Sequence, residues 1–130
     1  MHNELDVEKQ VAHWSKGADE AWEAAQDLIR RDRRISFGLF FVHLAFEKII
    51  KAHVWRAKKE MPPHIHNLNR LAELAEIPMN ADHKKVLAEI NEFNIEGRYS
   101  DLLSPPPSFE EANLYLQRAE GTFLWLKSLL

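Results

Sequence analysis

Residues Arg34 to Lys58 read RISFGLFFVHLAFEKIIKAHVWRAK. Apolar side chains cover most of the circumference of this segment when it is drawn as a helix, which is typical of a helix with neighbours on several sides. The segment is followed by Met61, Pro62 and Pro63, and proline cannot continue a helix. The sequence therefore predicts a long central helix. Because the chain has a single Thr and few Val, strands are not expected around it.

Apolar residues also recur at helical spacing on both sides of this segment. They predict further helices over about Asp6 to Arg31, Asn67 to Ala75, Ala81 to Arg98, and from a cap at Ser108 to the C-terminus. The expected N-caps are Asn3, His66 or Asn67, Asn80 and Ser108. The stretch from Tyr99 to Pro107 is expected to be a loop. Since short connections favour antiparallel neighbours, we expect an all-α, up-and-down bundle of four to five helices, forming one domain over residues 1–130.

Composition narrows the classes of protein that this chain can represent. Its 130 residues suit one domain, and 17 basic against 20 acidic residues exclude a strongly basic domain that coats nucleic acid. Cysteine is absent, which excludes disulfide frameworks and fits a reducing compartment, so we expect a cytoplasmic protein. The N-terminus shows no signal-peptide pattern. The most apolar stretch, Ile35 to Phe46, is shorter than the ~20 residues of a membrane span, so no membrane segment is expected.

Three polar residues lie along the apolar central helix. His43, Glu47 and Lys51 are spaced i, i+4, i+8 and therefore share one stripe. In one interpretation, Glu47 and Lys51 form an ordinary exposed ion pair and His43 is hydrogen-bonded at the edge of the core. In the other interpretation, the stripe belongs to a binding site.

A second polar set follows along the chain. Asn91, Asn94 and Arg98 share one helical face and are followed at once by Tyr99. A solvated face would explain them, but the planar guanidinium of Arg98 also suits phosphate.

Two histidines and two tryptophans are further candidate functional residues. His64 and His66 could ligate a metal, although histidines beside prolines at a helix start more often cap or donate hydrogen bonds. Trp55 and Trp125 are candidates for a partner surface, where aromatic residues are enriched, whereas Trp14 and Trp22 are expected in the core.

Three motifs together resemble a known family. They are FFVHLAFEKIIKA from Phe40 to Ala52, Pro62-Pro63 leading to His66-Asn67-Leu68, and NEFNIEGRYSD from Asn91 to Asp101. Their order and spacing are similar to those of the HEPN family, the higher eukaryotes and prokaryotes nucleotide-binding domain. The resemblance implies a helical bundle, commonly a homodimer, encoded beside or fused to a minimal nucleotidyltransferase.

Many HEPN members are RNases that use an Arg followed four to six residues later by a His. No Arg of this chain is followed by His at that spacing, and no His follows Arg98 at all. We therefore expect a binding domain for a nucleotide, RNA or partner protein in a toxin-antitoxin-like module, with no catalytic residue, cofactor or metal. The expected contact residues are Glu47, Lys51, His66, Asn94, Arg98 and Tyr99. An alternative is a metal-independent RNase whose His43 or His66 meets Arg98 across a dimer. A third is an interaction module in which the polar stripes are a dimer seam or solvated faces.

Overall fold

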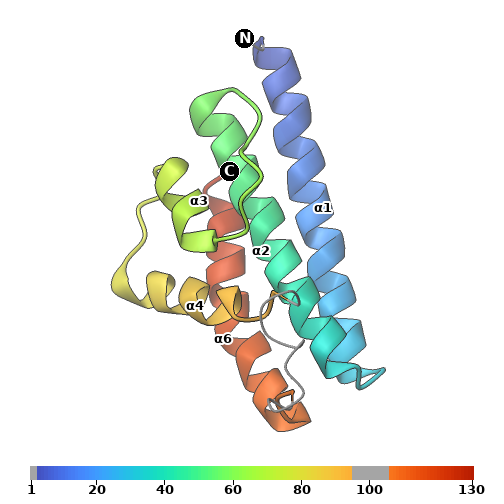
Figure 1. The fold of residues 1–130 in the computed structure, drawn as a ribbon. Coiled ribbons are helices and arrows are strands. Elements are labelled where there is room, and N and C mark those ends of the chain that lie inside the picture. The colour runs from blue at the N-terminus through green and yellow to red at the C-terminus, as the bar shows by residue number, and fades with distance from the viewer. Residues whose placement is uncertain (1–2, 95–105) are drawn as a thin grey trace.

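Helices form all the regular secondary structure that the computed structural model describes, which is residues 3–94 and 106–130. They are α1 (Glu4–Arg30), α2 (Ile35–Lys58), α3 (Leu68–Leu74), α4 (Ala81–Asn91) and α6 (Phe109–Ser128) (Figure 1). No strand occurs within these two ranges. The prediction of an all-α helical bundle is confirmed.

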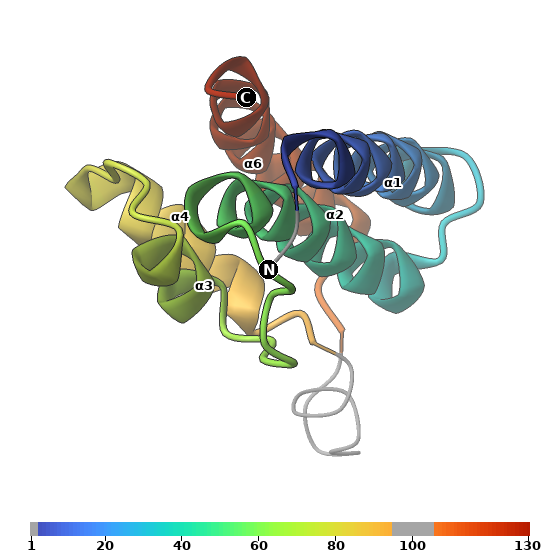
Figure 2. The same ribbon diagram turned by 90° about the horizontal axis from the view of Figure 1, so that it is seen from above.

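Helix α2 is central, as its apolar circumference predicts. It packs against α1, α3, α4 and α6. In Figure 1, α1 runs antiparallel to both α2 and α6. Seen from above, α3 and α4 lie on the side of α2 that faces away from α1 (Figure 2). Helices α1 and α2 approach each other closely at Gly38, where an added Cβ would overlap Cγ1 of Ile29.

An aromatic cluster joins the three long helices. The rings of Trp22 from α1 and Phe123 from α6 are stacked with centroids 5.0 Å apart, and Phe46 from α2 lies 5.6 Å from Phe123. Burying a large apolar side chain stabilises a fold by about 1.5–3 kcal/mol relative to leaving it exposed. These three rings therefore form a substantial part of the contact between the long helices.

The predicted caps are present at four helix starts. Side chains of Asn3, Asn67 and Asn80 accept hydrogen bonds from amides three residues on, at 2.8, 3.2 and 2.8 Å. Ser108 and Glu111 form the predicted capping box. Since each cap satisfies an amide that the helix leaves unpaired, these local signals fix where the helices begin.

Two expectations were wrong. Helix α4 ends at Asn91 and does not reach Arg98, because the amides of Glu92 and Phe93 turn to carbonyls three residues back and Phe93 enters the core against Tyr115. Trp55 is 2% exposed and is core, not a partner surface. Arg98 and Tyr99, with the predicted loop as far as residue 105, lie outside the described residues.

Trp125 is half-buried and stacks on His83, with ring centroids 3.8 Å apart. Among the described residues, no helix is both long enough and apolar enough to cross a membrane.

Candidate functional site

A buried carboxylate forms the centre of the candidate site. Glu47 of α2 accepts a hydrogen bond from Nζ of Lys51, one turn further along the helix, at 3.0 Å. Its other oxygen accepts one from Nδ1 of His66, in the connection between α2 and α3, at 2.8 Å. The side chain of Glu47 is 11% exposed and that of Lys51 8%. The ion pair is therefore present as the simpler interpretation expected, but its exposure was predicted wrongly.

Two opposing effects set the protonation of Glu47. Burial acts to raise the pKa of its carboxyl group, but the hydrogen bonds from His66 and Lys51 outweigh burial and hold the pKa below its usual value. Glu47 is consequently ionised at neutral pH. It is the only acidic side chain in the buried set of the described residues, and it needs its two donors to remain charged there.

His43 holds the backbone of the α2–α3 connection at His66. Its ring is 3% exposed, and Nε2 donates to the carbonyl oxygen of His66 at 3.0 Å. Burial lowers the pKa of His43, so its ring is neutral at neutral pH and carries its proton on Nε2. His66 is thus held by two hydrogen bonds, one through its carbonyl and one through its ring. Its side chain remains 58% exposed.

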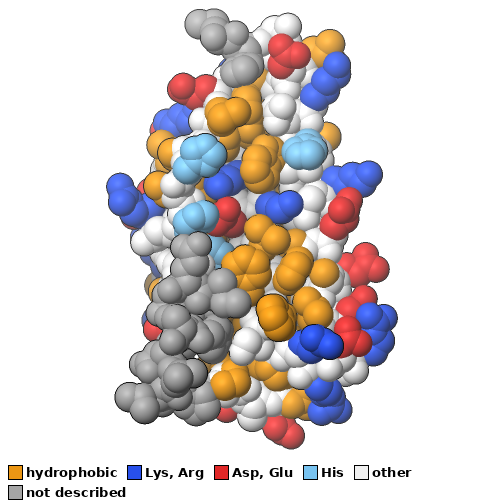
Figure 3. Space-filling view, turned by 45° about the vertical axis from the view of Figure 1, so that its right-hand side comes forward, with side chains coloured by type: hydrophobic (Ala, Val, Ile, Leu, Met, Phe, Trp, Pro, Cys, Tyr) orange, Lys and Arg blue, Asp and Glu red, His pale blue; other side chains and the backbone are white. Residues whose placement is uncertain are grey.

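An aromatic ring from α1 completes the surroundings of Lys51. The Nζ of Lys51 lies 5.7 Å from the ring centroid of Trp14, within cation–π range. Trp14 itself packs against a second, smaller core cluster that contains Trp55. Figure 3, which brings the α1 side forward, shows hydrophobic side chains next to Lys and His side chains on this face. The ammonium group is therefore placed at the seam between α1 and α2.

The predicted residues fall into three groups. The structure brings Glu47, Lys51 and His66 together. Asn94 is half-buried after the end of α4. Arg98 and Tyr99 lie outside the described residues.

Asn91 has a structural place outside this group. Its Oδ1 accepts from the amide of Leu68 at 2.8 Å, and its Nδ2 donates to Asn69 at 2.9 Å. Asn91 therefore fastens α4 to the start of α3.

Sequence reasoning did not connect Trp14 with Lys51. Helical periodicity places Trp14 on the apolar face of α1, but it does not state which residue of α2 lies opposite. Contact between two helices depends on their register and crossing angle, which only the packed structure supplies.

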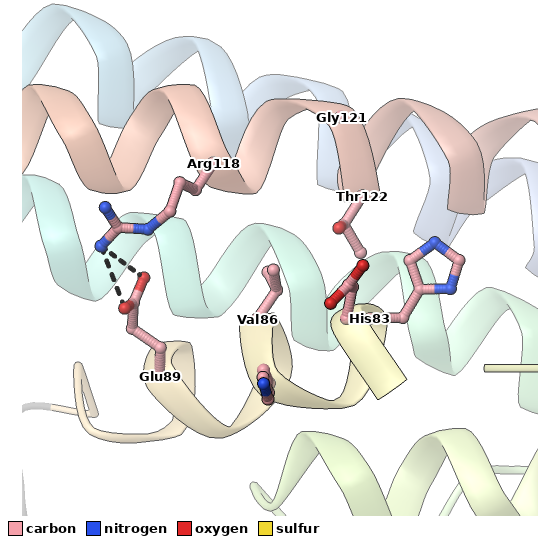
Figure 4. A pocket seen from close by; sticks show the side chains of 8 residues that line it. His83, Val86, Glu89, Arg118, Gly121 and Thr122 are labelled. Atoms are coloured by element: carbon pink, nitrogen blue, oxygen red, sulfur yellow. Dashed lines mark hydrogen bonds and ion pairs between the residues drawn. The ribbon is translucent and has the colours of Figure 1, made fainter. Parts of the chain in front are cut away.

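A separate groove lies between α4 and α6. Its volume is about 520 Å³, and Figure 4 shows Arg118 paired with Glu89 along one side. The two charged groups are 3.0 Å apart at their closest. Two acidic and two basic side chains line the groove, so it carries no excess charge. Across residues 3–94 and 106–130, no three His, Asp or Glu side chains are arranged as metal ligands.

Comparison with known proteins gives one family. Residues 11–129 match the HEPN domain, which is nearly the whole chain. Neither the curated proteins nor the solved structures contain a significant match. The match agrees with the all-α bundle. This chain therefore belongs to the HEPN family, at whose level nucleotide or RNA binding is the supported function.

Proposed function

We propose that this HEPN domain binds a phosphate-containing ligand, a nucleotide or RNA, through the face that carries Lys51. The observation that carries the proposal is the hydrogen-bonded group in which Glu47 holds both Lys51 and His66. The full set of contact residues that we propose is Glu47, Lys51, His66, Asn94, Arg98 and Tyr99.

The chemistry of Lys51 supports this assignment. An ammonium group has three donors, and Glu47 accepts from one of them. A buried cation that is fixed in position by a carboxylate and an aromatic ring loses little side-chain freedom when a phosphate binds. Arg98 would add a planar donor pair for the same phosphate, and the exposed ring of His66 would meet a base or ribose.

We further propose that the domain acts as a homodimer with a minimal nucleotidyltransferase in a toxin-antitoxin-like module. This part rests on the family alone. Its test is co-expression with any nucleotidyltransferase encoded beside this chain, followed by size-exclusion chromatography with light scattering. Co-elution of both proteins at one defined mass is expected, and separate elution would overturn the partnership.

Binding can be tested with Lys51→Gln and Arg98→Ala. Calorimetric titration with ATP, GTP, AMP and a single-stranded RNA decamer should give at least one ligand whose affinity falls about 10-fold or more in each variant, the loss expected for one charge-assisted hydrogen bond. Lys9→Gln, an exposed lysine near the N-terminal end of α1, is the charge-matched control. Unchanged affinity in both variants would contradict the proposed site.

A second function, RNA cleavage, is favoured by one specific observation. The exposed imidazole of His66 is oriented by a carboxylate at 2.8 Å, which is the arrangement of a general base and the group that orients it. Because His43 is buried against a backbone carbonyl, His66 is the better candidate of the two. Incubation of purified protein with mixed RNA should show cleavage that His66→Ala removes. Equal cleavage by both proteins, or none by either, rejects this function.

A further inference from the structure

A second lysine lies one turn before Lys51 on α2. Lys48 is half-buried on α2 and shares its face with Lys51 at i, i+3 spacing. It makes no hydrogen bond or ion pair with any group in residues 3–94 and 106–130. Asp19 of α1 is paired with Lys127. The ammonium group of Lys48 can therefore pair with an anionic ligand.

The place of Lys48 depends on a glycine of α1. A Cβ added to Gly17 would lie 3.2 Å from Cδ and 3.3 Å from Nζ of Lys48. The Lys48 side chain therefore lies against the backbone of α1 at Gly17, which has no side chain to occupy this space. One turn earlier on α1, the ring of Trp14 lies next to the ammonium group of Lys51. Two successive contacts with α1 thus place both lysine side chains at the α1–α2 seam.

The local charge favours an anion. Lys48 and Lys51 contribute two positive charges, and Glu47 is paired with Lys51. The groove between α4 and α6 has equal numbers of acidic and basic lining groups and offers no such excess. Of these two sites, the α1–α2 seam is the one with chemistry for binding phosphate.

We propose that Lys48 and Lys51 form a two-lysine subsite for two neighbouring phosphate groups across the α1–α2 seam, with Gly17 as the residue that leaves room for Lys48. The inference rests on the proposed function and goes beyond it, because it specifies linked phosphates as the ligand chemistry. Linked phosphates occur in a nucleoside triphosphate and, joined through ribose, in an RNA backbone. Lys48 is a positioning and specificity residue that distinguishes such ligands from a monophosphate.

Variants at positions 48 and 17 test the subsite. ATP, AMP and a single-stranded RNA decamer are titrated into the full chain by calorimetry. Lys48→Gln is expected to weaken ATP or RNA about 10-fold while changing AMP less than 3-fold. Gly17→Leu should have the same effect, because its side chain occupies the space of the ammonium group. Loss for ATP alone identifies a free nucleotide, and loss for RNA alone identifies a backbone. Gly17→Ala moves Lys48 by only a few tenths of an ångström and should stay within 2-fold of the wild type.

The outcomes separate this inference from the function on which it rests. If Lys51→Gln weakens binding but Lys48→Gln and Gly17→Leu do not, the two-lysine subsite is wrong and the proposed function stands. If Lys51→Gln alone leaves binding unchanged, the two-lysine subsite is wrong. If no ligand binds, or if neither Lys51→Gln nor Arg98→Ala changes binding, both are wrong. Thermal melting of Gly17→Leu provides the folding control. If Gly17→Leu melts at a lower temperature than the wild type, Lys48→Gln alone decides the result. Replacing Lys48 leaves no buried charge unpaired among the described residues.

Discussion

Nζ of Lys51 donates to the carboxylate of Glu47 at 3.0 Å, one turn apart on α2, and both side chains are buried. On an exposed helix such a pair contributes about 0.3–0.5 kcal/mol. In the present position each charge depends on the other, because burying either charge without its partner carries a large desolvation cost. The hydrogen bond to Glu47 fixes the ammonium group of Lys51 in position. For the same reason, replacing Lys51 should lower the stability of the fold.

Breaking this pair should destabilise the fold. Lys51→Met leaves the carboxylate of Glu47 with His66 as its remaining side-chain donor, and we expect a loss of about 3 kcal/mol in the free energy of unfolding. Glu47→Leu should cost a similar amount. The double variant removes both charges and should be more stable than either single variant. Urea unfolding of the four proteins measures the coupling, and strictly additive losses would show that the two side chains do not depend on each other.

Stability should fall in mild acid. Burial lowers the pKa of His43 and of His53, so the unfolded chain binds protons at these sites before the folded protein does. Their contribution is complete above the unfolded value of about 6.5 and is lost as the pH falls from there through the lowered folded values. Glu47, whose pKa is also lowered, adds a further loss below its usual range. Urea unfolding between pH 7.5 and 5 should show the first loss.

A substitution of His53 provides the control for this effect of pH on stability. His53→Gln, which removes a ring bonded to the carbonyl of Leu126, should be less stable at pH 7.5 but should vary less with pH. A variant whose pH slope equals that of the wild type would exclude His53 as a source.

The close approach of α1 and α2 predicts a sharp effect at Gly38. Its Cβ in Gly38→Ala would overlap Ile29, and overpacking of this kind costs about 1–3 kcal/mol. Adding Ile29→Val should restore part of that loss by removing a methyl group. Gly121→Ala is the matched control: no atom lies within 4 Å of its added Cβ, so it should stabilise α6 by about 0.5–1 kcal/mol. Thermal melting compares them, and a neutral Gly38→Ala would disprove the close contact.

Asn91 should prove structural and not functional. Asn91→Ala removes the acceptor for the amide of Leu68 and the donor to Asn69, and we expect a loss of about 1–2 kcal/mol. Hydrogen exchange should show that the amide of Leu68 loses protection. Binding of ATP or RNA should stay within 2-fold of the wild type at a temperature where both proteins are folded. A selective loss of binding at full stability would place Asn91 in the site.

Much of the fold was readable because its signals are local. Caps at Asn3, Asn67, Asn80 and Ser108 and the apolar circumference of α2 mark helix starts and the central helix, and each depends on residues within a few positions. The end of α4 was predicted too late, because it is set by the entry of Phe93 into the core beside Tyr115. That is a contact between helices, which periodicity within one helix does not contain.

For the site, the sequence alone determined that His43, Glu47 and Lys51 share one stripe of an otherwise apolar helix, since 3.6 residues per turn align them whatever the rest of the chain does. The tertiary structure decided that this stripe is buried, that His66 reaches back to Glu47 from the α2–α3 connection, and that Trp14 and Gly17 lie opposite Lys51 and Lys48. Burial and pairing between segments depend on how helices pack against one another. The geometry of a helix determines which of its residues share a face, but the packing of neighbouring helices determines what that face contacts.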